Sequence, residues 1–404
     1  MKKYSLGALV AAGLLVGGLS AGSASAADLG GNCCADLEER VAELEATTAR
    51  KGNRKVSLTI SGWVAEQAMW WDDDFTGESN TYVGGLGATL NSNFKFTGQA
   101  TISPGWYAGY VIHIEVTGSE TLTMTNQDTA TGAGLFGGGL RGVSTLQSFW
   151  FIKSDHLGKL SVGLQSQASD NTAILPDGSG SLVPANFVQF DYGGFATSAG
   201  AWIALTGCTD CNGIPLNSVR YDTPVFGGFS ASASWGEDDF WDVAARYAGE
   251  HGGFKVAVAA AYSESTDSGA PGIGGAFVQA DNTRFFQIGG YVEHVSTGLF
   301  AYGAYGQLSV LDGPGGDLND FNYVKVGLRE RWSPLGHTVL YGEHEKFNND
   351  AGDAEVDLWG VGVVQEIDAA AMSVWLSYRN LSGEQGGVDV DDFQYVKAGA
   401  LINF

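Results

Sequence analysis

Carboxylates and cations occupy different parts of this 404-residue chain. Cations lie on runs that alternate like β-strands: Lys95, Arg220, Arg246, Lys325, Arg329 and Arg379. Aspartates gather in one long polar stretch, about residues 168–217: Asp170, Asp177, Asp191 and Asp210. If this stretch folded into a wet cavity walled by the strands, the opposed charges would create a transverse field that orients dipolar solutes and sorts ions. The alternative is that the aspartates only solvate a surface loop.

The stretch itself is long for an irregular segment of a compact domain, which indicates either a functional loop or an unrecognised element. Residues 187–190 and 201–205 are apolar enough to form strands within it. Near its end, Cys208 and Cys211 are separated by two residues in a polar setting, with no helix pattern after them. In an exported chain this arrangement favours a local disulfide over a redox motif.

Residues that usually indicate an enzyme or a metal site do not converge. Residues 18–22 match the pattern of a serine nucleophile elbow, but they lie in a leader that is removed. The six histidines are scattered without metal-ligand spacing, and His344 lies on a strand-like run where a surface or lumen position is expected. Residues 132–137 match a dinucleotide fingerprint in letters only, with no strand before them and no helix after them. We predict no enzymatic activity and no organic cofactor.

Residues 1–26 have the three parts of a cleavable secretory signal: two lysines, an apolar run from residue 6 to 19, and small residues at 24–26. A membrane anchor is the alternative, but the run is shorter than the roughly 18 residues that a spanning helix needs. Loss of Lys2 and Lys3 changes the formal net charge from −24 to −26, because 19 basic residues then remain against 45 acidic ones. Such acidity excludes nucleic acid as a partner and favours cations or divalent-bridged polyanions.

The remaining chain alternates with the period of two that is typical of strands. In the last run Val396, Ala398 and Ala400 share one face, and pairing with the run that begins at residue 56 would leave no open edge. Short and long connections alternate between the runs, which a soluble sandwich has no reason to do. We therefore predict an all-β chain, a 16-stranded antiparallel transmembrane barrel over residues 56–404. Its runs lie near 56–71, 88–102, 106–117, 144–154, 158–166, 218–224, 228–236, 240–248, 254–264, 284–294, 299–310, 321–331, 337–347, 356–366, 371–382 and 392–404.

Residues 147–167, QSFWFIKSDHLGKLSVGLQSQ, resemble the alphaproteobacterial outer-membrane porin family, and residues 56–66 and 357–379 do so as well. The resemblance implies a homotrimer that forms a water-filled diffusion channel, with the third long loop, about 168–217, folded into the barrel. It also implies that Phe404 belongs to a signal read by the barrel-assembly machinery. The second long loop, about 118–142, could by the same resemblance latch onto a neighbouring subunit.

Two further features have open interpretations. Residues 27–55 form a predicted periplasmic segment with a helix over 36–50, which is either a short solvated helix or a trimeric coiled coil. The adjacent Cys33 and Cys34 could pair with each other or between chains. Acidic clusters in the long loops could hold Ca²⁺ or Mg²⁺ shared with lipopolysaccharide phosphates, or could be solvated only: Asp72–Asp74, Glu237–Asp239 and Asp389 with Asp391 and Asp392.

Together these features predict an outer-membrane porin, surrounded by lipid and lipopolysaccharide, that passes small hydrophilic solutes and ions passively. Three alternatives stay open at this point. The first is a substrate-selective channel with a solute site at the constriction formed by the long loop. The second is a barrel enzyme or adhesin, and the third is a secreted soluble sandwich.

Overall fold

The computed structural model describes residues 55–118, 142–236, 239–266, 282–311 and 316–404, and also residues 122, 125, 127 and 279. The predicted leader, the predicted helix over 36–50 and the Cys33–Cys34 pair lie outside the described residues. So do most of the second long loop and the acidic residues Glu237 and Asp238.

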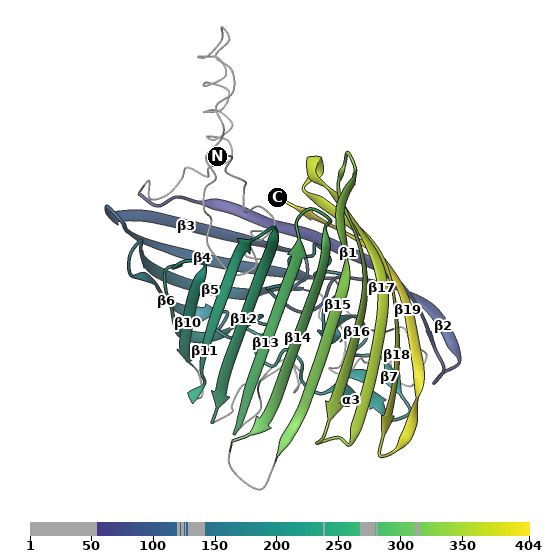
Figure 1. The fold of residues 1–404 in the computed structure, drawn as a ribbon. Coiled ribbons are helices and arrows are strands. Elements are labelled where there is room, and N and C mark those ends of the chain that lie inside the picture. Colours follow the sequence, from purple (N-terminus) through teal and green to yellow (C-terminus); the bar gives the residue numbers. More distant parts are fainter. Residues whose placement is uncertain are drawn as a thin grey trace.

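One antiparallel sheet closes on itself and forms a barrel (Figure 1). The closing pair is β1 with β19, in register from Trp63 opposite Asn403 to Asp73 opposite Phe393. Closure gives the first and the last strand a partner each. A membrane barrel needs this, because lipid supplies no hydrogen bonds to a free strand edge. The strands are β1 (Thr59–Asp73), β2 (Glu78–Gly84), β3 (Asn93–Ser103), β4 (Trp106–Thr117), β5 (Gly142–Ser154), β6 (Gly158–Gln165), β9 (Leu216–Asp222), β10 (Phe229–Gly236), β11 (Trp241–His251), β12 (Phe254–Ser265), β13 (Thr283–His294), β14 (Leu299–Val310), β15 (Asp317–Ser333), β16 (Gly336–Asn349), β17 (Ala354–Ile367), β18 (Met372–Gln385) and β19 (Val388–Asn403).

The predicted sixteen strands are confirmed, and one strand was missed. β2 pairs with the far half of β1, whereas β3 pairs with its first half. The two strands therefore occupy one position of the barrel, and residues 85–92 leave the wall between them. β2 escaped prediction because its sequence is polar and lacks an apolar alternation.

The outward faces of the strands are apolar, as the period of two predicts. Val64, Val326 and Leu376 are each about half exposed and face away from the lumen. Trp70 and Trp106 lie near opposite ends of this apolar band, where the aromatic girdles of membrane barrels are found. Such a surface is stable in a bilayer, whereas in water it would be an aggregation site.

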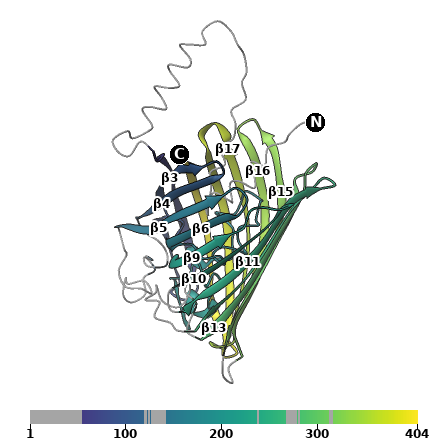
Figure 2. The ribbon, with the colours of Figure 1, turned by 90° about the vertical axis from the view of Figure 1, so that its left-hand side faces the viewer.

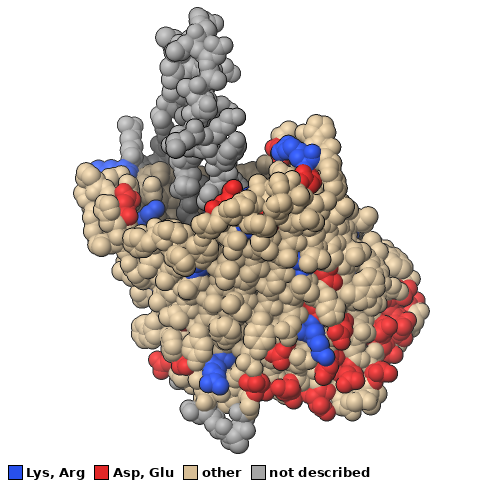
Figure 3. Space-filling view, in the orientation of Figure 1, with Lys and Arg blue, Asp and Glu red and all other residues tan. Residues whose placement is uncertain are grey.

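The connections at the two ends of the barrel differ in length. Tight turns such as 104–105, 252–253 and 334–335 lie at the end that also holds both strand termini, 59 and 403, at the top of Figure 1. The longer connections lie at the other end, but the predicted alternation is not complete, because the tight turn 386–387 joins β18 and β19 there. Acidic side chains gather over that end in the space-filling view (Figure 3), as expected for loops outside the membrane.

The long stretch after β6 lies inside the barrel. It contains a 3₁₀ turn η1 (Gln189–Asp191), a two-stranded hairpin β7 (Ala196–Thr197) and β8 (Gly200–Ala201), and the short helix α3 (Trp202–Thr206). The prediction of strands at 187–190 and 201–205 was therefore wrong, because these apolar side chains pack as a core and need no strand geometry. None of the helices in the described residues has the length and apolar character needed to cross a membrane.

The lumen is not lined by polar strand faces throughout, which corrects a simple apolar-out, polar-in expectation. Phe321, Phe393 and Tyr395 point inward and are fully or almost fully buried. They pack against aromatic residues of the inward loop, with ring centroids 4.4 Å apart for Phe187 and Phe321 and 4.7 Å apart for Phe195 and Phe393. Part of the barrel interior is thus a hydrophobic core between loop and wall.

The outward apolar band gives a test of membrane burial. Leu376 on β18 and Leu335 in a tight turn are equally exposed, at 52%. We predict that Leu376→Arg lowers the free energy of unfolding in lipid by about 2–4 kcal/mol, the range measured for a cation at mid-membrane on such a surface. Leu335→Arg should change it by less than about 1 kcal/mol, because the turn lies at the interface. Equal effects of the two changes in urea titrations with phospholipid vesicles would contradict this assignment.

Candidate functional site

The inward loop, residues 166–217, is held against the inner wall by charged contacts from several strands. Lys325 of β15 donates to Asp177 Oδ2 at 2.5 Å and to the Ala185 carbonyl at 2.7 Å, and the side chains of Lys325 and Asp177 are fully buried. The rings of Tyr302 and Tyr341 lie 5.7 Å from the same ammonium. This ammonium is therefore fully partnered by the protein, so it has little capacity left for a solute.

A second contact centres on Asp191 in η1. Lys397 of β19 forms an ion pair with Asp191, and Gln67 of β1 donates to its other oxygen at 2.8 Å. The Arg379 guanidinium of β18 lies 3.8 Å from the Asp191 carboxylate. It donates to both oxygens of Glu343, at 2.7 and 2.8 Å, and to the Asn186 carbonyl at 2.8 Å. Burial alone would raise the pKa of Asp191, but Lys397 and Arg379 hold it below its ordinary value.

Arginines at the start of the loop bind its backbone instead of its carboxylates. Arg220 of β9 donates to the carbonyls of residues 166 and 167 at 2.9 Å, and Arg246 of β11 donates to the Ala168 carbonyl at 2.5 Å. Asp170 lies among these groups without an ion pair in the described part of the chain. Burial raises its pKa to about 7.

The structure thus brings together only part of the predicted charge set. Lys325 meets Asp177, and Arg379 approaches Asp191, but both contacts are closed and buried and do not face each other across water. Arg329 pairs with Glu366 at 2.9 Å, away from the loop aspartates. Lys95 of β3 stands opposite His113 of β4 on another part of the wall.

Sequence reasoning missed the residues that complete these contacts. Lys397, Glu343 and Gln67 belong to strands that are far from the loop in sequence, so spacing gives no sign of their partners. Their inward position in a strand pattern was the only available signal. The sequence did favour the disulfide between Cys208 and Cys211, which is present in the structure. Asn319 of β15 binds this turn through the Cys208 carbonyl at 2.6 Å.

One wall of the lumen keeps partly exposed inner side chains. They belong to β1 and β3–β5, and they are Trp63, Lys95, Thr97, Val111 and Phe149. Strands β3–β6 lie together on one side of the barrel in the view of Figure 2. A passage past the loop would therefore run along this wall.

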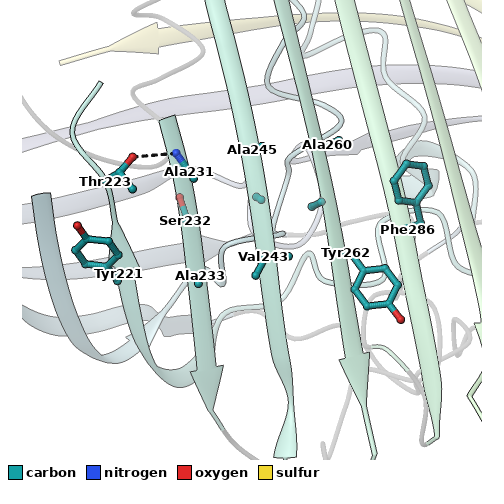
Figure 4. A pocket seen from close by; sticks show the side chains of 12 residues that line it. Tyr221, Thr223, Ala231, Ser232, Ala233, Val243, Ala245, Ala260, Tyr262 and Phe286 are labelled. Carbon is teal, nitrogen blue, oxygen red and sulfur yellow. Dashed lines mark hydrogen bonds between the residues drawn. The ribbon is translucent and has the colours of Figure 1, made fainter. Parts of the chain in front are cut away.

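A shallow groove of 480 Å³ lies on the outer face of β9–β13 (Figure 4). Small side chains such as Ala233, Ala245 and Ala260 form its floor, and Tyr221, Tyr262 and Phe286 border it. Because it belongs to the apolar outer face, it faces lipid and is no part of the solute passage. Among the described residues no group of three or more His, Cys, Asp or Glu is placed to hold a metal ion.

The buried ion pairs predict that the loop depends on single wall cations. We expect Lys325→Met to lower the free energy of unfolding by about 3–5 kcal/mol, since it leaves the Asp177 carboxylate buried without a partner. Arg331→Met is the matched control: its pair with Asp368 is half exposed, so a loss of at most about 1 kcal/mol is expected. The measurement is unfolding in detergent, followed by single-channel conductance. A Lys325→Met protein as stable as the control would show that the pair does not hold the loop.

The comparisons with known proteins agree with this architecture. No curated protein matches the chain in sequence. An anion-selective porin from Comamonas acidovorans is 18% identical, and the match covers 86% of this chain and 100% of that one with a TM-score of 0.58. OprB from Pseudomonas putida in a high-pH structure is 10% identical over 91% of this chain and 97% of its own, also with a TM-score of 0.58. A trimer form of OmpT from Vibrio cholerae is 14% identical, with coverage of 86% and 99% and a TM-score of 0.53.

At such identities these structures show the fold alone. The family follows from a family model, described as Gram-negative porin, that matches residues 8–372. This match gives the outer membrane as the location and a channel as the general function. The narrower expectation of an alphaproteobacterial porin is not tested by it. The chain belongs to the Gram-negative porin family.

Proposed function

We propose that the protein is a passive channel for small hydrophilic solutes and ions across the outer membrane. The observation that supports this most directly is the one-sided lumen: a fixed loop on one side, and partly exposed inner side chains such as Lys95 and Thr97 on the other. Passive diffusion needs a water-filled path in which no solute is held strongly. The fixed walls of that path set the largest solute that can pass. No catalytic role is needed for any described residue.

Bilayer recordings test passive diffusion. We predict stepwise conductance in planar lipid bilayers that rises in proportion to KCl concentration, because ions in a wide wet path do not compete for one site. Liposomes that contain the protein should swell in small sugars at rates that fall smoothly with sugar size. Strong block by one sugar, with no effect of others of the same size, would instead favour the substrate-selective channel. Protein that is folded but never conducts would overturn the proposal.

We further propose a homotrimer. The neighbour from Vibrio cholerae includes a trimer form, and the outward apolar band of this chain is available for contacts between barrels. Phe404 is more than half exposed at the end of the closing strand, where the assembly machinery could bind it. The trimeric coiled coil proposed for residues 36–50 would lie on the same side as the strand termini.

The trimer has a direct test. We predict that detergent-solubilised protein has three times the mass of one chain by light scattering, and that it runs as a heat-sensitive oligomer on gels. Removal of residues 27–55 serves as the control for the coiled coil, and it should leave the trimer intact if barrel contacts suffice. A monomeric mass for the full mature chain would contradict the proposal.

Divalent ions are proposed at the outer rim. Two of the predicted acidic clusters meet there, because the backbone of Asp74 hydrogen-bonds to the Asp392 carbonyl at 3.1 Å. Ca²⁺ or Mg²⁺ takes oxygen ligands and often keeps several waters, so phosphates of lipopolysaccharide would complete such a site. The protein carboxylates alone do not form one in the described residues.

A further inference from the structure

Lys95 differs from the other lumen cations that the sequence singled out. Lys325 and Arg379 are buried and bound to carboxylates, and Arg220 and Arg246 bind loop carbonyls. The Lys95 side chain is partly exposed, and within the described chain its ammonium has no hydrogen bond or ion pair. A cation with free donors on the open wall of a channel is available to a solute.

Other groups around Lys95 can also donate hydrogen bonds, and two of them have no partner among the described residues. His113 stands directly opposite it on β4 and is 3% exposed, and neither ring nitrogen has a partner in the part of the chain that the structure describes. The same holds for the buried hydroxyl of Thr97, two residues along on the same inner face of β3. Ser61 of β1 stands opposite Lys95 on the other side. Unpartnered buried polar groups are rare in native proteins, and one explanation is a ligand or ion that binds there.

The spacing fits one small anion. Directly opposed residues of an antiparallel pair have Cβ atoms about 4.5–5.5 Å apart, and residues two apart on a strand are about 7 Å apart. Side chains of this length can therefore converge on one oxyanion. The imidazole of His113 carries an N–H in either tautomer, so it can donate one hydrogen bond to such an anion. Glu115, two residues from His113 on the same face of β4, accepts the Asn91 N–H at 3.0 Å.

We propose that Lys95, His113, Thr97 and Ser61 form a binding site for a small oxyanion, a carboxylate or a phosphate group of a passing solute. Lys95 provides the charge, and the other three provide directed donors. This inference rests on the proposed channel function and gives it a solute class. The site involves none of the ion pairs that hold the inward loop, so it does not depend on a transverse field between loop and wall.

Reversal potentials in a salt gradient test the charge. In planar bilayers with a tenfold KCl gradient, Lys95→Gln should shift the permeability ratio toward cations by about threefold or more. Lys153→Gln is the matched control: it removes the same charge from an exposed inward position on β5, and it should shift the ratio clearly less. Equal shifts would overturn the site, since they would show a diffuse effect of lumen charge.

Anion block tests the donors. Inorganic phosphate and acetate, added in separate arms, should reduce the KCl current saturably in the unaltered protein, and the stronger blocker identifies the favoured group. His113→Leu and Thr97→Val each remove one donor, so each should raise the half-blocking concentration by about tenfold. Stepwise conductance in each variant establishes that it folds, and Lys153→Gln, outside the site, should block like the unaltered protein. A conducting protein that neither anion blocks, or block that is unchanged in Lys95→Gln, overturns the site and leaves the channel function intact.

Discussion

The constraint on which the structure depends is that lipid cannot hydrogen-bond to the backbone. Every strand in the bilayer must therefore have two neighbours, and the first and last strands must meet. The pairing of β1 with β19 meets this requirement over most of both strands. The outward apolar band and the polar outer rim follow from the same requirement, because the closed sheet has lipid on one side and a protected interior on the other.

Closure also creates the environment in which the inward loop is fixed. Inside the barrel the loop is shielded from water by aromatic side chains, so each charge there needs a partner in the protein. Lys325, Arg379 and Lys397 supply these partners from three strands, which spreads the attachment of the loop around the wall. Glu345 of β16 differs: it is fully buried, and neither of its carboxylate oxygens has a hydrogen-bond partner in the described part of the chain.

The strands could be predicted from sequence because their signal is local: side chains alternate with a period of two, and turn residues separate one run from the next. The ends of the strands were harder to predict. β2, for example, pairs with the far half of β1 although its sequence has no apolar alternation. The loop contacts could not be predicted, because Asp177 and Lys325 are 148 residues apart and no pattern links them. The inward aromatics Phe321 and Phe393 were unexpected for a related reason, since a strand pattern shows that two faces differ but does not show what covers the inner one.

The one-sided filling of the lumen determines where selectivity can arise. Lys325, Arg379 and Lys397, which touch the loop, are neutralised by carboxylates at contact distance, and a paired charge has only a weak field beyond its partner. A solute that passes the loop therefore encounters mainly the charges on the opposite wall. A net charge of −24 for the whole chain says little about this path, because much of it lies on loops at the outer end (Figure 3). Under the proposal made for Lys95, the sign of the preferred ion is set by groups along β3 and β4 that lack partners among the described residues.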